Sequence, residues 1–406
     1  MKSWNLSNNI KVVFKETNGM DACSVKLASS VSVINEEVQN AGVSYLTATL
    51  MGKSTKSRTS KVLANDIDNI GADLYGTAEY DMSLFNVSCL SQYFDKSAEI
   101  LSDIILNPDF KEQELTFEKQ NVLASLTARK DSIGATALDE FLKLFYKSDP
   151  YSNPVIGNHK SVEKITIQDL NDWHKHSYNS ESILLSVVGN LKEDVVHKTL
   201  EKCFGSIPKC TKIKQAKIPP VFSESIKNEV DGKFNQAYIY LGFTAPKCLS
   251  KYSVPLKLAS AVLGGRMTSR LFVELREKLG LAYEVSAVYP SRKEESYFAI
   301  YIGLDKKNIE LTLNKINEIL KNFCSAEISQ QELKDTKNYM KGLYIMDRQT
   351  VGKQSYYYVW REIIGQGYQY DAQYLENIEN VTTREIVDIA NKTFNSPSVT
   401  VVINPK

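Results

Sequence analysis

The apolar positions between residues 264 and 283 recur at the spacing of an amphipathic helix. The residues that form this apolar face are Leu271, Phe272, Leu275 and Leu279. Thr268 and Ser269 are candidate N-caps, and Gly280 suits the left-handed conformation that often follows the last turn of a helix. We therefore predict a helix that ends before Gly280 and holds polar side chains at its C-terminal end.

The charged residues of this predicted helix differ in whether a partner lies one turn away. Glu274 lies four residues from both Arg270 and Lys278, so it can pair with either along the helix face. Arg276 has no acidic residue three or four positions away on either side. Because the helix dipole favours a cation at the C-terminal end, Arg276 can be explained as a solvated charge. A role in binding is the alternative, and the spacing alone leaves both open.

One succession of elements occurs twice along the chain. Residues 71–125 predict two strands followed by two helices, and residues 280–344 repeat that order. Residues 209–224 are rich in lysine and proline without periodicity, which is typical of a linker. We predict two α+β domains, residues 1–208 and 225–406, each a mostly antiparallel sheet with helices packed on one face.

Length and composition fit two domains and exclude several classes of partner. A chain of 406 residues with 43% hydrophobic content exceeds one ordinary core. The 49 Lys and Arg against 48 Asp and Glu give no electrostatic reason to expect nucleic acid or an anionic membrane as partner. No signal peptide and no apolar run long enough for a membrane span are evident. We expect a cytoplasmic protein, although a removed export signal or an organellar source also fits.

The cysteines and histidines form no recognisable chemical motif. The six cysteines, which lack C-x-x-C spacing and favour reduced thiols, are Cys23, Cys89, Cys203, Cys210, Cys248 and Cys324. Cys203 and Cys210 flank a possible turn and only weakly indicate a pair. His174 and His176 lie in a polar segment and are interpreted as solvated surface residues, with a weak metal site as the alternative.

Residues 264–283 resemble a segment of the pitrilysin and insulysin-like zinc peptidases, particularly the mitochondrial processing peptidase-like branch. There a glycine-rich turn precedes the pattern SRLFxxxREKxGLAY, which this chain matches without a gap. The resemblance covers nearly the whole chain, including residues 187–191 and 236–246. In that family the arginine and the tyrosine seven residues later reach an active site held by a different domain. The resemblance therefore implies that Arg276 binds the substrate backbone and that Tyr283 stabilises the oxyanion.

The same resemblance implies a zinc site that this chain has lost. The family binds zinc through H-x-x-E-H, in which two histidines are ligands and the glutamate is the base, with a further glutamate about 75 residues downstream. Ungapped alignment places Tyr45 and Thr49 at the histidines, Ala48 at the base and Ser125 at the distal glutamate. Ala48 has no polar group, and the others are poor zinc ligands. We expect no metal or other cofactor in this chain.

We therefore interpret the chain as the non-catalytic subunit of a heterodimeric zinc metallopeptidase. On its own it would not be an enzyme. A homologous partner with an intact H-x-x-E-H would hold the zinc, and the two subunits would close like a clam shell around peptides or unfolded polypeptides. The main alternative is a structural or assembly subunit, like the respiratory-complex core proteins of the family. A self-sufficient hydrolase with an unrecognised site is a further alternative.

Overall fold

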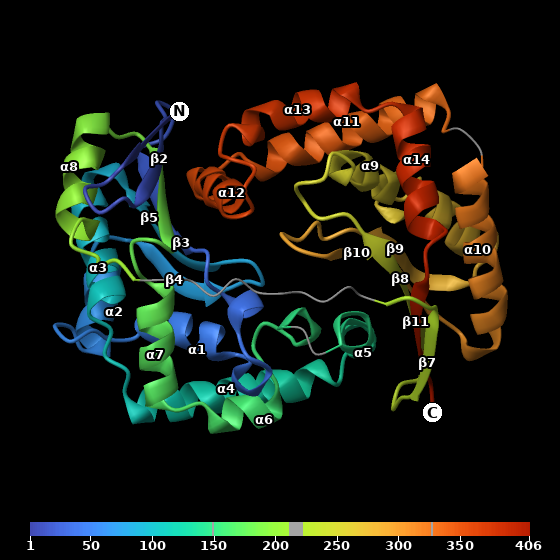
Figure 1. The fold of residues 1–406 in the computed structure, drawn as a ribbon, viewed down its shortest axis with the longest axis horizontal. Helices are drawn as coiled ribbons and strands as arrows, with labels where there is room; N and C mark the ends of the chain where they lie inside the picture. Colours follow the sequence, from blue (N-terminus) through green and yellow to red (C-terminus); the bar gives the residue numbers. More distant parts are fainter. Residues whose placement is uncertain (148–149, 211–221, 326–327) are drawn as a thin grey trace. The chain divides into compact units, whose positions relative to one another are not determined.

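The structure is a computed structural model that describes residues 1–147, 150–210, 222–325 and 328–406 (Figure 1). These residues form two compact units, which are treated separately below. Unit 1 takes the described residues of three segments, Met1–Leu126, Asn153–Lys217 and Asp347–Asp371. Unit 2 takes the described residues of Thr127–Ser152, Ile218–Met346 and Ala372–Lys406.

Each unit takes in one segment from the other half of the sequence. Residues 347–371 belong to unit 1, and residues 127–152 belong to unit 2. The predicted domains 1–208 and 225–406 are continuous stretches of sequence, so they do not include this exchange. Most of the predicted linker, residues 211–221, lies outside the described residues.

Unit 1 is built on a six-stranded sheet with the order β1-β2-β6-β3-β5-β4. Its strands are β1 (Lys2–Asn5), β2 (Lys11–Glu16), β3 (Ala22–Ser29), β4 (Asp73–Ala78), β5 (Ser83–Leu90) and β6 (Ile183–Gly189). All neighbouring pairs are antiparallel except β2 and β6. Because side chains alternate along a strand, β3 sends Cys23, Val25 and Leu27 into the main core of the unit and Ser24, Lys26 and Ala28 to the opposite face.

Helices cover both faces of this sheet. The helices of unit 1 are α1 (Val43–Met51), α2 (Ser60–Asn69), α3 (Phe94–Leu106), α4 (Glu112–Arg129, which continues into unit 2), α6 (His159–Lys164), α7 (Ile167–Ser177), α8 (Glu193–Phe204) and α12 (Val351–Ile363). Short 3-10 turns η1 (Val33–Asn35), η2 (Val38–Asn40) and η3 (Ser91–Tyr93) connect them. Figure 1 shows α3 and α8 on one side of the sheet, whereas the exchanged helix α12 packs on β3 and β6 from the other.

Unit 2 repeats this plan with a five-stranded sheet in the order β7-β11-β8-β10-β9. Its strands are β7 (Ile226–Asp231), β8 (Ala237–Ala245), β9 (Ala282–Val288), β10 (Ser296–Leu304) and β11 (Ser398–Asn404), and only β7 and β11 are parallel. Its helices are α5 (Ile133–Tyr146), η4 (Pro150–Ser152), α9 (Ser253–Gly264), η5 (Phe272–Lys278), η6 (Lys306–Asn308), α10 (Ile309–Ser325), α11 (Gln330–Asp347), α13 (Tyr370–Asn380) and α14 (Thr383–Phe394).

The exchanged helix of unit 2 occupies the position that α12 has in unit 1. Phe141 of α5 lies 4.7 Å, between ring centroids, from Tyr240 on one face of β8. Phe394 of α14 lies 5.4 Å from Phe243, whose side chain points to the other face. The predicted α+β class and mostly antiparallel sheets are confirmed, and so is the repeated order of two strands and two helices. The prediction that helices cover one face is corrected, because each exchanged helix covers the second.

Candidate functional site

The N-terminus of α1 is capped by a buried carboxylate. Gly42, just before the helix, has a left-handed backbone with φ of 97°, and a Cβ there would lie 2.8 Å from the carbonyl oxygen of Ile156. The Glu36 carboxylate accepts hydrogen bonds from the N–H groups of Gly42 (2.9 Å) and Ser44 (2.8 Å), and from the Ser44 hydroxyl. These contacts satisfy donors that a helix leaves open at its first turn.

The environment of Glu36 opposes its ionisation. The residue is 6% exposed, and burial raises the pKa of its carboxyl to about 7, against the effect of the hydrogen bonds from Ser44 and Gly42. The sequence analysis did not single out Glu36. Its only local signal is an acidic residue shortly before a glycine that begins a helix.

Helix α1 carries the positions aligned with the zinc motif, and it packs against α4, which carries the fourth. Leu46 and Leu50 of α1 share an apolar cluster with Val122 and Leu126 of α4, and Tyr45 packs against that cluster. The tertiary structure thus brings together the two helices that the resemblance connects. Tyr45 serves as packing rather than as a free side chain in solvent.

The side chains at these positions do not form a metal site. Ala48 is fully buried, Thr49 and Tyr45 are half-buried, and Ser125 is exposed on α4. Nowhere in the described part of the chain do three or more His, Cys, Asp or Glu side chains come together as a group that could hold a metal ion. The residues therefore do not fit the zinc that the resemblance associates with this place.

A buried acid on α4 escaped the sequence analysis. The buried stripe of this helix consists of Leu115, Glu118, Val122 and Leu126. Glu118 is 7% exposed, and its carboxylate receives a long hydrogen bond of 3.5 Å from Asn121. Glu118 and Ser125 are seven residues apart and so project from similar faces of the helix. The helical spacing alone could have located Glu118, but it gives no sign of a function.

His174 is not the solvated side chain that the sequence analysis favoured. Its Nε2 lies 2.8 Å from the carbonyl oxygen of Ile105, and its ring stacks on Tyr178. Burial lowers the pKa of His174 and so favours the neutral ring. The interpretation as a surface residue is corrected for His174, which has a packing role in unit 1.

In unit 2 the predicted helix before Gly280 forms, but most of it is a π-helix. After a short α-helical turn at residues 270–271, η5 runs as a π-helix over Phe272–Lys278. The N–H of Leu279 donates to the carbonyl oxygen of Glu274 at 3.2 Å, five residues back, as this wider helix requires. Leu271 and Leu275 are fully buried as predicted, whereas Leu279 is 43% exposed.

The caps and ion pairs of η5 confirm part of the prediction. Gly280 is left-handed, with φ of 60°. The Ser269 hydroxyl is buried and has no partner in the described part of the chain, so it does not cap the helix. Lys278 pairs with Glu274, whereas Arg270 binds Glu332 of α11 through two hydrogen bonds of 3.0 and 2.7 Å. Of the two partners that the spacing offers Glu274, the structure thus shows Lys278, and Arg270 pairs with Glu332 instead.

Arg276 and Tyr283 lie on adjoining elements that are tied together by the backbone. Arg276 is exposed on η5, where its guanidinium lies 5.0 Å from the centroid of the Phe272 ring. Tyr283 is 58% exposed in β9, the terminal strand of the sheet. The N–H of Leu281 donates to the carbonyl oxygen of Leu275 at 2.8 Å and so connects the start of the strand to η5.

Apart from the contact of Arg276 with the Phe272 ring, neither polar side chain has an evident structural role. Within the described ranges, we find no ion pair of Arg276 and no hydrogen bond of the Tyr283 hydroxyl. The surroundings thus leave both groups available to bind a ligand. The structure describes Arg276 and Tyr283 in unit 2, and Tyr45, Ala48, Thr49 and Ser125 in unit 1.

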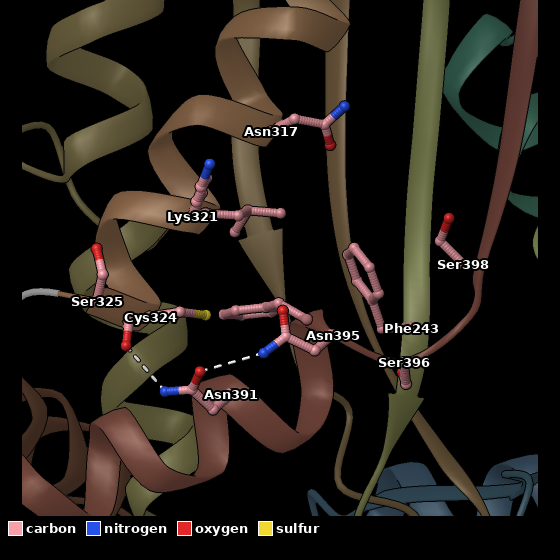
Figure 2. A pocket seen from close by; sticks show the side chains of 11 residues that line it. Phe243, Asn317, Lys321, Cys324, Ser325, Asn391, Asn395, Ser396 and Ser398 are labelled. Carbon is pink, nitrogen blue, oxygen red and sulfur yellow. Dashed lines mark hydrogen bonds between the residues drawn. The ribbon is translucent and has the colours of Figure 1, made fainter.

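A separate cavity of about 550 Å³ opens between α10 and α14 of unit 2. Figure 2 shows that Lys321 and Cys324 of α10 line it together with Asn391 of α14 and with Asn395, the residue that follows this helix. The amide of Asn391 donates to the Cys324 carbonyl oxygen at 2.8 Å, and the amide of Asn395 donates to the Asn391 side-chain oxygen at 3.1 Å. Much of its polar lining is thus engaged internally, and neither Arg276 nor Tyr283 belongs to it.

Comparison with known families gives two matches along the chain. Residues 11–159 match the model described as "Insulinase (Peptidase family M16)". Residues 164–340 match the model described as "Peptidase M16 inactive domain". None of the helices in the described ranges combines the length and the apolar character that a membrane span requires.

Individual relatives resemble the chain over almost its full length. A protein of Rickettsia felis named "Uncharacterized zinc protease" is 26% identical over 98% of this chain and 96% of its own length. A protein of Helicobacter pylori named "Non-peptidase homolog YmxG" is 22% identical over 98% of this chain and 92% of its own length.

Solved structures show the same fold. The "peptidase M16 inactive domain" from Pseudomonas fluorescens superimposes with a TM-score of 0.91 at 20% identity, covering 100% of this chain and 98% of that one. A structure described as a protease from Helicobacter pylori gives a TM-score of 0.90 at 22% identity, with coverage of 100% and 99%. At these identities the likeness concerns the fold alone.

Proposed function

Because the chain belongs to peptidase family M16, we propose that it is the non-catalytic subunit of a two-chain zinc peptidase of that family. A homologous partner with an intact H-x-x-E-H would bind the zinc and activate the water. This chain would supply Arg276 to hold the substrate backbone and Tyr283 to donate a hydrogen bond to the oxyanion. The substrates would be peptides or unfolded polypeptides, and we place the pair in the cytoplasm.

The observation that carries this proposal is the contrast between the two sets of aligned positions. The side chain of Ala48 is buried and has no polar atom, and those of Thr49 and Ser125 carry no charge. These positions therefore supply neither a zinc ligand of the usual kind nor a catalytic base. Arg276 and Tyr283, by contrast, are exposed on η5 and β9, and the backbone hydrogen bond from Leu281 to Leu275 connects these two elements. A role in another subunit's active site accounts for both facts together.

The energetic importance of such a contribution is large. A preorganised donor to an oxyanion lowers the barrier by about 3 to 4 kcal/mol, so its loss slows turnover about a hundred- to a thousandfold. A partner without this chain would therefore retain its zinc and yet work slowly. The name "Non-peptidase homolog" of the Helicobacter pylori relative supports a non-catalytic member, whereas the Rickettsia felis relative is named a zinc protease.

The edge strand β4 adds a means of binding an extended peptide. β4 is the terminal strand of the unit 1 sheet, so its outer edge can pair with an added strand. Main-chain pairing of this kind binds many sequences and excludes segments that are already folded. This supports unfolded polypeptides as the substrate class.

The test combines this chain with a family M16 homologue that carries H-x-x-E-H and follows hydrolysis of an unstructured fluorogenic peptide. We expect cleavage in the mixture well above the sum of the separate chains. Arg276→Ala and Tyr283→Phe should each slow it by a hundredfold or more. Arg384→Ala, at an exposed position of α14, and Tyr252→Phe, whose hydroxyl binds Lys392, are matched controls that should retain full rate.

Three results would count against the proposal. Full activity of both the Arg276→Ala and the Tyr283→Phe mixtures would show that these groups do not take part in catalysis. If this chain forms stable complexes with its partners and none of these complexes has peptidase activity, the alternative role as a structural or assembly subunit is favoured. Peptide hydrolysis by this chain alone, lost on chelation, would instead indicate a self-sufficient enzyme.

A further inference from the structure

Two cysteines that are far apart in the sequence face each other across neighbouring strands. Cys23 of β3 and Cys89 of β5 are direct register partners in an antiparallel pair, and their Sγ atoms lie 3.7 Å apart. Directly opposed residues in such a pair have Cα atoms about 4.5 or 5.5 Å apart. Both spacings lie within the range of about 4.4 to 6.8 Å that a disulfide spans. The two thiols can therefore join without moving the strands.

The packing around the pair holds the two sulfurs together. Gly189 of β6 lies on the other side of Cys23, and a Cβ at that position would lie 2.4 Å from the Cys23 Cβ. The missing side chain thus leaves the space that Cys23 occupies. Cys23 and Cys89 both belong to the main core of unit 1 and are 1% and 7% exposed.

The pair nevertheless lies close to solvent at one end of the sheet. Leu90, which ends β5 next to Cys89, is 49% exposed, and Met20, shortly before β3, is 69% exposed. Cys89 itself is 7% exposed, so a small oxidant can reach its side chain without unfolding of the sheet.

Hydrogen bonding distinguishes Cys89 from two half-buried cysteines of the chain, Cys203 and Cys324. The hydrogen bond with Cys23 and one with Ser97 lower the pKa of the Cys89 thiol, although burial opposes them. Burial raises the pKa of the Cys203 and Cys324 thiols. Because the thiolate is the nucleophile, Cys89 should react with an oxidant before these two.

We propose that Cys23 and Cys89 form a reversible redox pair, which closes to a cross-strand disulfide when the protein meets a peroxide or a low-molecular-weight disulfide. With hydrogen peroxide, the Cys89 thiolate attacks one oxygen, becomes a sulfenic acid and expels hydroxide, which leaves as water after it takes up the proton that the Cys89 thiol had released. The Cys23 sulfur then attacks the Cys89 sulfur and displaces the second oxygen, again as water. Overall, two thiols and one peroxide become one disulfide and two waters, and a thiol reductant reverses the change.

Formation of the disulfide would constrain the part of unit 1 that contains α1, the helix with Tyr45, Ala48 and Thr49. The chain between Cys23 and Cys89 contains α1, α2 and β4. A cross-link between its ends restricts the unfolded chain over this whole segment and therefore stabilises the folded state. The inference is independent of the proposed peptidase role, because it concerns the thiols of this chain alone.

The experiment treats the full reduced chain with hydrogen peroxide or oxidised glutathione and maps the peptides without reduction. We expect a loss of two hydrogen atoms from the intact mass, and one cross-linked species that joins the Cys23 and Cys89 peptides. Dithiothreitol should reverse both. The oxidised protein should melt about 5 °C or more above the reduced protein.

Variants identify the order of the steps. In Cys23→Ala, oxidised glutathione should leave a persistent adduct on Cys89, whereas Cys203→Ala should still form the cross-link. Oxidation of Cys203 or Cys324 in the wild-type chain while Cys23 and Cys89 stay reduced would overturn the proposal. So would conversion of Cys89 to a sulfinic acid with Cys23 still free, and the wild-type map decides these points even if Cys23→Ala folds poorly.

Discussion

The Glu36 carboxylate accepts the backbone N–H of Ser44 at 2.8 Å and so caps the helix that carries the degenerate zinc-motif positions. Its burial and its raised pKa, about 7, make this contact sensitive to pH. Because the folded chain holds the Glu36 proton more tightly than the unfolded chain, stability is greatest below the ordinary pKa of 4.5 and decreases as pH rises toward 7.

We therefore predict that Glu36 contributes a pH-dependent part of the free energy of unfolding, roughly 3 kcal/mol lost between pH 4.5 and 7. Urea unfolding over this pH range should show it in the wild-type chain. In the Glu36→Gln variant, the free energy of unfolding should lose this part of its dependence on pH. In the control Glu376→Gln, a change at an exposed residue, the dependence on pH should stay as in the wild type. An identical slope in wild type and Glu36→Gln would show that this carboxyl does not titrate as expected.

Gly76→Ala should disturb the contact of α1 with the edge strand β4. A Cβ at Gly76 would lie 2.4 Å from the Ala48 carbonyl oxygen and 2.4 Å from the Phe85 ring, so backbone must shift. We expect a loss of about 1 to 3 kcal/mol in the free energy of unfolding. At Gly342 in α11, an added Cβ would meet no atom within 4 Å outside the helix's own backbone. Gly342→Ala should therefore leave the free energy of unfolding unchanged or raise it by up to about 1 kcal/mol. Equal stabilities of the two variants would contradict the tight packing of α1.

Zinc should not stabilise this chain on its own. Neither Ala48 nor Ser125 supplies a ligand of the kind that holds zinc, and the residues that the structure describes contain no group of three or more His, Cys, Asp or Glu that could bind it. We expect metal analysis of the purified chain to find far less than one zinc per molecule. Melting curves should likewise be unchanged by added zinc. A rise in Tm with zinc that a chelator reverses would refute this.

Arg276→Ala and Tyr283→Phe should leave folding unaffected. Both side chains are exposed, and substitutions at such positions change stability by less than about 0.5 kcal/mol. Leu275→Ala, which removes a fully buried side chain of η5, should cost about 2 to 5 kcal/mol. Urea unfolding of the three variants tests this. A marked destabilisation by Arg276→Ala or Tyr283→Phe would indicate a structural role and weaken the proposal that they serve a partner's site.

Much of the local structure follows from short-range patterns. The alternation of apolar residues predicted β5 and β10, and the helical spacing predicted α3 and α10. Gly280 predicted a left-handed residue after η5, because few residues other than glycine adopt the left-handed backbone conformation readily. The ungapped motif also located Arg276 and Tyr283, whose exposure agrees with a binding role that awaits experiment.

The contacts between distant residues could not be predicted in this way. The exchange of α5 and α12, the Arg270–Glu332 pair and the approach of Cys23 to Cys89 all join residues far apart in sequence. Even the cap that Glu36 forms at the start of α1, only a few residues away, depends on the course of the intervening loop, which the periodicity of apolar residues does not predict. Local patterns carry no information about which face of which sheet a segment meets.

The sequence by itself determined the repeated strand and helix order, because residue type and spacing suffice for it. Through the family resemblance it also identified the four positions, Tyr45, Ala48, Thr49 and Ser125, at which the zinc-binding residue types are missing. Only the tertiary structure decided which helices cover the second face of each sheet and which thiols meet. Those outcomes depend on the register between strands and on packing between segments, which chain neighbours do not specify.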